Sequence, residues 1–163
     1  MAEQFSIIKE FRFEAAHLLD GHDGKCNNLH GHGYILLLEI SQVLHQNGAK
    51  EGMVIDFGDV KTMIDTYLIQ DLDHAFIYNL NNEREKTIAT TLEGVHSKVY
   101  PVSFRTTAEL LARHIYQKVK ELGIPVVKVS LAESSGSIAL YQEWWINTGF
   151  VSSKFFKVYR EKG

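Results

Sequence analysis

The fold is decided by residues 5–44, which read FSIIKEFRFEAAHLLDGHDGKCNNLHGHGYILLLEISQVL. In the first part of this stretch, every second residue is apolar or histidine: Phe11, Phe13, Ala15 and His17. This period of two is typical of a strand with one buried face, so we predict a strand from Phe5 to His17. A turn with glycine and asparagine follows over residues 20–28, and strand character resumes from His32 to Leu44. The stretch therefore predicts two antiparallel strands joined by a loop.

Two amphipathic helices are predicted in the middle of the chain. The first is indicated by apolar residues that recur at spacings of three and four: Val60, Met63, Ile64, Tyr67 and Leu68. Asp56 is placed to cap its start. The second helix begins with the capping-box pattern of Thr106 to Glu109 and ends before Gly123-Ile124-Pro125. Helices of this kind need an apolar surface to cover.

The remaining segments complete a single α+β domain over residues 1–163. A C-terminal hairpin is predicted from the strands Val127–Leu131 and Ile138–Trp144. The element order ββααββ favours a four-stranded antiparallel sheet with two helices on one face. Residues 81–104 are polar and without a clear period, so we expect a long loop there. Residues 147–163 form a C-terminal extension to this domain.

The composition excludes several functional classes. A net charge of -3 and a pI near 6.2 argue against a nucleic-acid partner, because a phosphate backbone is normally met by a basic surface. The longest strongly apolar run, Tyr34 to Leu38, is far below the roughly 20 residues that cross a bilayer, so no membrane partner is expected. Cys26 is the only cysteine, and the start of the chain lacks the order of a secretion signal. We therefore expect a cytoplasmic protein without a disulfide.

Three histidines of the N-terminal stretch predict a metal site. His30 and His32 are two residues apart, so both side chains leave the same face of an extended strand. His17 ends the preceding strand and reaches the same point if the two strands pair. Three neutral imidazoles suit Zn²⁺ and leave a fourth position for water or substrate, although ligand type alone also allows iron or nickel. A His-x-His pair by itself is a weak signal, and ordinary loop histidines are the alternative.

Acid–base candidates lie in two further places. Cys26 lies four residues before His30 and beside Lys25, a cation that favours a thiolate, so it is a candidate nucleophile or base. The alternative for Cys26 is a buried, inert cysteine. Asp73 adjoins His74, and a carboxylate in that position can fix the tautomer of an imidazole for proton relay.

Two glutamates are weaker candidates. Glu133 follows the strand Val127–Leu131 on the parity of its apolar residues, so we expect its carboxylate to face inward, where a ligand would be its partner. Glu109 has an ordinary structural explanation as the acid of the capping box. A functional role for Glu109 therefore ranks second to that explanation.

Several motifs together resemble a known family. They are, in chain order, FEAAH (Phe13 to His17), CNNLHGH (Cys26 to His32), GMVIDFGDVK (Gly52 to Lys61), LDH (Leu72 to His74) and the acid of LAES (Leu131 to Ser134). In this combination the chain resembles the 6-pyruvoyl-tetrahydropterin synthase family from about Phe5 to Tyr141. The three residues between Cys26 and the HGH motif are most similar to the bacterial branch that serves queuosine synthesis.

The resemblance implies a tunnelling fold whose subunits assemble into a barrel. The implied assembly is a homo-oligomer, a hexamer built as a dimer of trimers, with active sites at subunit interfaces. The implied zinc ligands are His17, His30 and His32. The implied catalytic residues are Cys26 as proton acceptor, with His74, Asp73 and Glu133 forming a relay. The implied substrate contacts are Glu133, Glu109 and Thr107.

The resemblance also implies a reaction. A zinc-dependent lyase would convert 7,8-dihydroneopterin triphosphate to a 6-carboxytetrahydropterin with loss of acetaldehyde and triphosphate. One alternative is elimination of triphosphate to a 6-pyruvoyl product, for tetrahydrobiopterin or folate-related synthesis. An alternative of another class is a non-catalytic zinc- or pterin-binding module, against which Cys26 argues because binding needs no thiol base. The chain departs from the family pattern at Thr106, where proline is frequent, and in the length of residues 81–104.

Overall fold

The structure is a computed structural model, and it describes residues 3–143 and 157–159. Its strands are β1 (Phe5–His17), β2 (His30–Gln42), β3 (Ala75–Asn79), β4 (Val99–Val102), β5 (Val126–Ser134), β6 (Ser137–Gln142) and β7 (Lys157–Tyr159). Its helical segments are η1 (Lys25–Asn27), α1 (Phe57–Ile64), η2 (Asp65–Ile69), α2 (Gln70–Leu72), α3 (Glu83–Gly94) and α4 (Ala108–Glu121). The predicted extension over residues 147–163 lies outside the described residues, except for β7.

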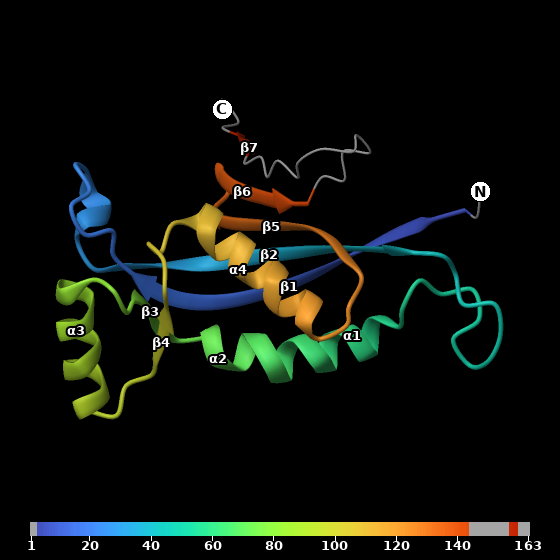
Figure 1. Ribbon diagram of the computed structural model, residues 1–163, viewed down its shortest axis with the longest axis horizontal. Coiled ribbons are helices and arrows are strands. Elements are labelled where there is room, and N and C mark those ends of the chain that lie inside the picture. The colour runs from blue at the N-terminus through green and yellow to red at the C-terminus, as the bar shows by residue number, and fades with distance from the viewer. Residues whose placement is uncertain (1–2, 144–156, 160–163) are drawn as a thin grey trace.

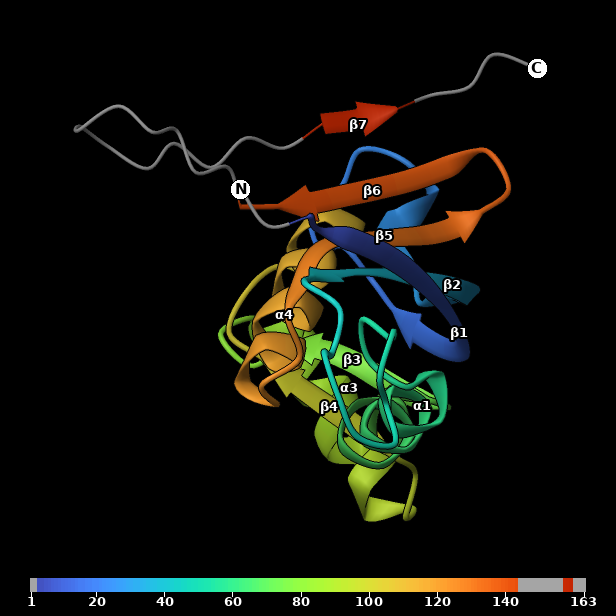
Figure 2. The same cartoon turned by 90° about the vertical axis from the view of Figure 1, so that its right-hand side faces the viewer.

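A mixed sheet of seven strands is the frame of the fold, in the order β4-β3-β1-β2-β5-β6-β7. β1 and β2 pair antiparallel over their whole length, from Phe5 opposite Gln42 to His17 opposite His30. β5 and β6 continue the sheet beyond β2 as an antiparallel hairpin, and Figures 1 and 2 show that the sheet twists and curves along this order. The α+β class, the first pair of strands and the C-terminal hairpin are confirmed.

The prediction of a purely antiparallel sheet of four strands is wrong. β3 and β4 extend the sheet on the far side of β1, and they run parallel to β1 and to each other. β3 has five residues, and it pairs with β1 only where Ala15 meets Ala75 and Ala16 meets Phe76. A short, mostly buried strand carries no alternation of apolar and polar residues, so its period does not reveal it.

The prediction of a long loop over residues 81–104 is also wrong, because this interval holds α3 and β4. Asn82 caps α3 by accepting a hydrogen bond from the backbone N–H of Glu85 at 2.9 Å. The buried carboxylate of Glu85 accepts the N–H of Asn79 at 2.6 Å, which ties the helix to the end of β3. Only Glu85 and Ala89 of α3 are buried, so the helix lacks the apolar stripe that periodicity would detect.

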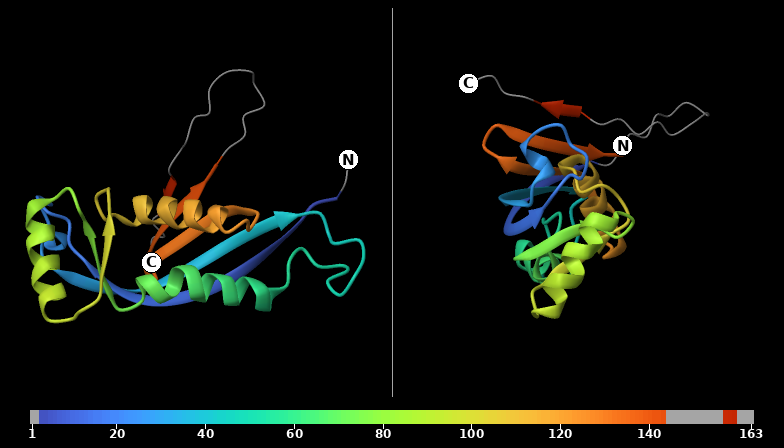
Figure 3. Two further views of the ribbon diagram at one scale, coloured as in Figure 1. Left: turned by 60° about the horizontal axis from the view of Figure 1, so that its bottom comes forward. Right: turned by 90° about the vertical axis from the view of Figure 1, so that its left-hand side faces the viewer.

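The segment α1–η2–α2 and helix α4 cover one face of the sheet, whereas α3 packs against Phe76 in a separate apolar cluster on the other face. α4 packs on β5 and β6, and the continuous segment α1–η2–α2 runs along β1, as Figure 3 shows. Asp56 caps α1 as predicted, since its carboxylate accepts the N–H groups of Gly58 and Asp59. The core between the helices and the sheet includes fully buried side chains from both: Tyr34, Leu36, Ile64, Leu68, Leu111 and Ile115. Within residues 3–143, the helices are too short or too polar to cross a membrane.

Candidate metal centre and active site

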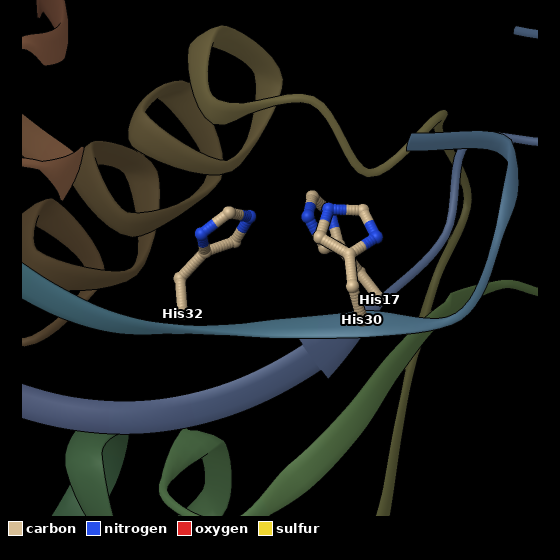
Figure 4. Close-up of side chains that lie close together, drawn as sticks. All are labelled: His17, His30 and His32. Carbon is tan, nitrogen blue, oxygen red and sulfur yellow. The ribbon is translucent and has the colours of Figure 1, made fainter. Parts of the chain in front are cut away.

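Three imidazoles converge where β1 ends and β2 begins. His17 and His30 are directly opposite in the β1–β2 ladder, and His32 follows two residues later on the same face of β2. One nitrogen of each ring lies within 4.8 Å of one nitrogen of the other two. Figure 4 shows the three rings rising from the strands toward the loop that leads into α4. The pairing that the sequence predicted therefore brings its three candidate ligands to one point.

Backbone carbonyls fix the orientation of two of these rings. His17 Nδ1 lies 2.7 Å from the carbonyl oxygen of Thr106, and His30 Nδ1 lies 2.7 Å from that of Asn28. A carbonyl oxygen only accepts hydrogen bonds, so Nδ1 carries the proton in both rings and Nε2 has a free lone pair. The Nε2 atoms of His17, His30 and His32 are buried and have no hydrogen-bond partner. Buried acceptors that point at one another without a partner fit a bound cation.

The protonation state of His17 suits this role. Burial, with further effects from the nearby His30 and His32, lowers the pKa of His17 to about 4, although its hydrogen bond to Thr106 acts in the opposite direction. The ring is therefore neutral at pH 7, which is the form that binds a metal ion. A set of three imidazole nitrogens fits a borderline transition metal better than Mg²⁺ or Ca²⁺, which prefer oxygen ligands.

A cavity of about 360 Å³ opens beside the histidines. Several predicted site residues line it: His17, Cys26, His30, Thr107, Glu109 and Glu133. Cys26 belongs to η1, and its half-buried position comes from a loop closed by a hydrogen bond from the Leu19 N–H to the Cys26 carbonyl at 2.8 Å. The structure thus places a thiol, two carboxylates and a candidate metal centre around one space, which is the set of groups needed to bind a polar ligand and move protons.

Glu133 is the carboxylate nearest to the histidines. Its Oε1 lies 3.8 Å from His17 Nε2 and 3.9 Å from His32 Nε2, and the buried Tyr34 hydroxyl donates to it at 3.3 Å. The pairing of β5 with β6 shifts register between Ala132 and Ser134, so Glu133 sits at a bulge. Bulges redirect side chains next to functional sites, and this one allows the predicted inward direction of Glu133.

Tyr34 is a site residue that the sequence reasoning missed. It follows His32 by two residues on β2, so its side chain lies on the same face, and its ring stacks on Phe13 with centroids 4.9 Å apart. Burial, aided by the neighbouring Glu133 carboxylate, raises the pKa of Tyr34 well above its usual value. The hydroxyl therefore keeps its proton and remains a hydrogen-bond donor. The sequence does contain a signal for this role, the HGHGY pattern. In an extended strand His30, His32 and Tyr34 are each two residues apart, so all three side chains lie on the same face.

The cap of α4 differs in detail from the prediction. Thr107 is the N-cap residue, and its hydroxyl accepts from the Leu110 N–H at 3.5 Å, whereas Thr106 is buried and donates its Oγ1 hydrogen to the Leu18 carbonyl. Glu109 is consequently the second residue of the helix and not the acid of a capping box. The capping-box explanation for Glu109 is therefore removed, although an acid in the first turn still suits the helix dipole, and Glu109 lines the cavity.

Asp73 and His74 form a pair, but not in this cavity. His74 Nδ1 lies 2.9 Å from Asp73 Oδ2, and the pKa of Asp73 is lowered by the Glu14 N–H and then by His74. His74 lines a second cavity of about 450 Å³ together with Gly31. Gly31 lies between His30 and His32 on β2, so it faces the opposite side of the strand from these two histidines. Its side chain is 74% exposed. Within one chain, the structure does not bring His74 together with Cys26 or Glu133.

Sequence comparison identifies close relatives. The family profile described as 6-pyruvoyl tetrahydropterin synthase matches residues 6–143. The 6-carboxy-5,6,7,8-tetrahydropterin synthase of Haemophilus influenzae is 51% identical over 140 residues, which cover 85% of this chain and 99% of that protein. The protein of the same name from Aquifex aeolicus is 34% identical, over 86% of this chain and 99% of its own. The match thus extends over nearly the whole length of both relatives.

Solved structures share the fold. The 6-pyruvoyl tetrahydropterin synthase of Caenorhabditis elegans aligns with a TM-score of 0.61 at 22% identity, over 86% of this chain and 96% of that one. The enzyme of that name from Plasmodium falciparum aligns with a TM-score of 0.64 at 17% identity, over 87% and 99% of the two chains. At these identities the likeness establishes the architecture alone.

Proposed function

This chain belongs to the 6-pyruvoyl tetrahydropterin synthase family, and from that membership we propose that it catalyses the 6-carboxy-5,6,7,8-tetrahydropterin synthase reaction of queuosine biosynthesis. It converts 7,8-dihydroneopterin triphosphate and one water molecule to 6-carboxy-5,6,7,8-tetrahydropterin, acetaldehyde and triphosphate, and the carbon–carbon cleavage makes it a lyase. The observation that carries this assignment is the 51% identity over 99% of a relative with that name. The cavity supports it, because a thiol, two carboxylates and three convergent imidazoles line or border one space.

The metal in this proposal is zinc. His17, His30 and His32 would hold it through the three buried Nε2 atoms, and the Nδ1 contacts of His17 and His30 to backbone carbonyls orient their rings for this purpose. When bound, zinc acts as a Lewis acid that makes the hydroxyl groups of the substrate side chain more acidic. A three-histidine set leaves room for such oxygen ligands from the substrate.

The other cavity residues take the substrate. The Glu133 carboxylate would accept hydrogen bonds from the amino-pyrimidine edge of the pterin, while the Tyr34 hydroxyl holds Oε1 in place. Glu109 and Thr107, which line the same cavity at the start of α4, would make further substrate contacts. Cys26 Sγ would accept the proton removed from a carbon of the substrate side chain. Each group has a task that matches its chemistry and its place in the cavity.

Asp73 and His74 require a second copy of the chain in this scheme. The Asp73–His74 pair is already formed and exposed, and His74 lines the second cavity and not the one that contains Cys26 and Glu133. A homo-oligomer in which one subunit presents this pair to the cavity of its neighbour would complete the proton relay. We propose that arrangement, with a hexamer built as a dimer of trimers as the assembly.

Product analysis tests the proposal. Zinc-loaded protein is incubated with 7,8-dihydroneopterin triphosphate, and the pterin product and acetaldehyde are identified by mass spectrometry. The 6-carboxy product with an equal amount of acetaldehyde is expected. A 6-pyruvoyl product without acetaldehyde would move the chain to the other activity of the family. A Cys26→Ala variant separates enzyme from binding module, because a module that only binds pterin would function without the thiol.

A further inference from the structure

Helix α3, which no functional assignment above uses, contacts the loop that carries Cys26. We define residues 19–28 as the Cys26 loop. Figures 1 and 3 show this loop and α3 at the same end of the sheet. We propose that Arg84 of α3 is a positioning residue that holds the Cys26 loop closed and so sets the place of the thiol in the cavity.

Arg84 reaches both ends of the loop with one nitrogen. Its Nη1 donates to Asp20 Oδ1 at 2.9 Å and to Asn27 Oδ1 at 3.0 Å. Asn27 is the chain neighbour of Cys26, and Asp20 begins the turn that leads to it. Asn82, the cap of α3, adds a hydrogen bond from Nδ2 to Asp20 Oδ2 at 3.0 Å. The first turn of α3 therefore fixes the loop through two separate residues.

Bonds inside the loop pass this constraint to the cysteine. The Gly21 N–H donates to Asn27 Oδ1 at 3.0 Å, so the same oxygen that receives Arg84 also closes the loop on itself. At the preceding residue, the Cys26 carbonyl accepts a hydrogen bond from the Leu19 N–H at 2.8 Å. Loss of the Arg84 contacts would leave Asp20 held by Asn82 and Arg105, but the side chain of Asn27, the chain neighbour of Cys26, would keep only the bond from Gly21.

Helix α3 is a firm support for these contacts. The buried Glu85 carboxylate fixes its first turn to Asn79, and Ala89 packs with Leu18 and Phe76 in a small apolar cluster. The Arg84–Asp20 pair itself is partly exposed, with 44% and 34% of the side chains accessible. Exposed pairs contribute little to global stability, so their loss should alter the loop far more than the fold. A thiol displaced by about 1 Å loses much of its catalytic efficiency.

The predicted effect on turnover rests on the proposed function, whereas the effect on thiol accessibility does not. Cys26 is the only cysteine of the chain, so alkylation by iodoacetamide reports on this position alone. In zinc-loaded, full-length Arg84→Ala protein we expect alkylation to be about five-fold faster than in the wild type. This is the change in loop opening that follows from losing an exposed ion pair of ordinary strength. We expect kcat to fall about ten-fold, with KM within about two-fold, because the pterin contacts lie elsewhere.

A matched control and a second variant make the test decisive. Lys86→Ala removes an exposed ion pair with Glu83 on the same helix that does not touch the loop, so its alkylation rate and kcat should equal those of the wild type. Arg84→Lys should recover part of the lost kcat. The effects of Asp20→Ala and Arg84→Ala should be less than additive in the double variant, because each substitution alone removes the contact between Arg84 and Asp20. An Arg84→Ala alkylation rate at or below the wild-type rate would overturn the proposal, while failure of wild-type turnover would overturn only the proposed function.

Discussion

His17 and His30 occupy one directly opposed pair of the β1–β2 ladder, and each ring is oriented by a backbone carbonyl through Nδ1. The metal centre is therefore a product of strand register. A slip of one residue would move His30 to the other face of the sheet. Because the buried core side chains of both strands depend on the same register, the energy that folds the sheet also assembles the centre.

Loss of one imidazole should abolish tight zinc binding. We expect His17→Ala to lower zinc affinity at least about 100-fold, because two nitrogens remain and the metal would lose a fixed ligand. Competition with a chromophoric chelator measures the affinity, and elemental analysis gives the stoichiometry. His45→Ala, in an exposed loop at the other end of β2, is the matched control and should bind one zinc per chain. Undiminished affinity in the His17 variant would rule out the three-histidine centre.

A mixture of two inactive variants should regain activity. If the relay of one chain serves the cavity of another, Cys26→Ala and His74→Ala are each inactive, but equal amounts reassociated together should give about a quarter of wild-type activity, since that share of sites has both groups. The two variants are gently dissociated, mixed and allowed to reassemble, and the recovered activity is measured as acetaldehyde released. A mixture that stays inactive, although reassembly of the wild type restores turnover, would place the complete relay within one chain.

The Tyr34 hydroxyl should affect binding more than chemistry. Tyr34→Phe keeps the stacking on Phe13 but removes the donor to Glu133 Oε1. We expect KM for the pterin to rise about five-fold with kcat nearly unchanged, which corresponds to about 1 kcal/mol of uniform binding. Steady-state kinetics on the purified variant separates the two constants. A fall in kcat at constant KM would instead assign Tyr34 to the chemical step.

Acid should destabilise the fold through His114. Burial, as the main cause, lowers the pKa of this residue to about 4, and its Nε2 lies 2.8 Å from the Tyr100 hydroxyl oxygen. Between about pH 6.5 and pH 4 the unfolded chain binds a proton at this position that the folded chain does not, so stability falls as the pH falls through this range. The full effect is about 3 kcal/mol.

The measurement is urea unfolding of wild type and His114→Gln at pH 7 and pH 4.5. The glutamine amide can still hydrogen-bond the Tyr100 hydroxyl but does not titrate in this range. The loss of unfolding free energy between the two pH values should therefore be smaller in the variant. Equal losses in both proteins would show that His114 does not contribute to the acid sensitivity.

The sequence predicted those parts of the molecule that have a clear period. Alternation located β1 and most of β2, and together with the His-x-His spacing it indicated the metal centre before any pairing was known. It failed at β3, which is too short to alternate, and at α3, whose hold on the sheet comes from the buried polar Glu85 and not from an apolar stripe.

The position of the His74 side chain could not be predicted from the sequence, for a different reason. Its backbone has φ of 60°, in the left-handed region that residues other than glycine seldom adopt, and its N–H donates to the Glu14 carbonyl at 2.6 Å. The direction of this side chain thus depends on a tertiary contact with β1. The sequence alone shows that Asp73 and His74 are neighbours, but not which face of the sheet they occupy.

The hydrogen bond that orients His17 is accepted by the main chain of Thr106, and this makes the metal centre tolerant of genetic change. Every amino acid, proline included, supplies a backbone carbonyl at position 106. Only the Oγ1 bond to Leu18 depends on the threonine side chain. The orientation of His17 can therefore survive a substitution at position 106 that fits this buried site, whereas His17 itself has no replacement that would keep the geometry.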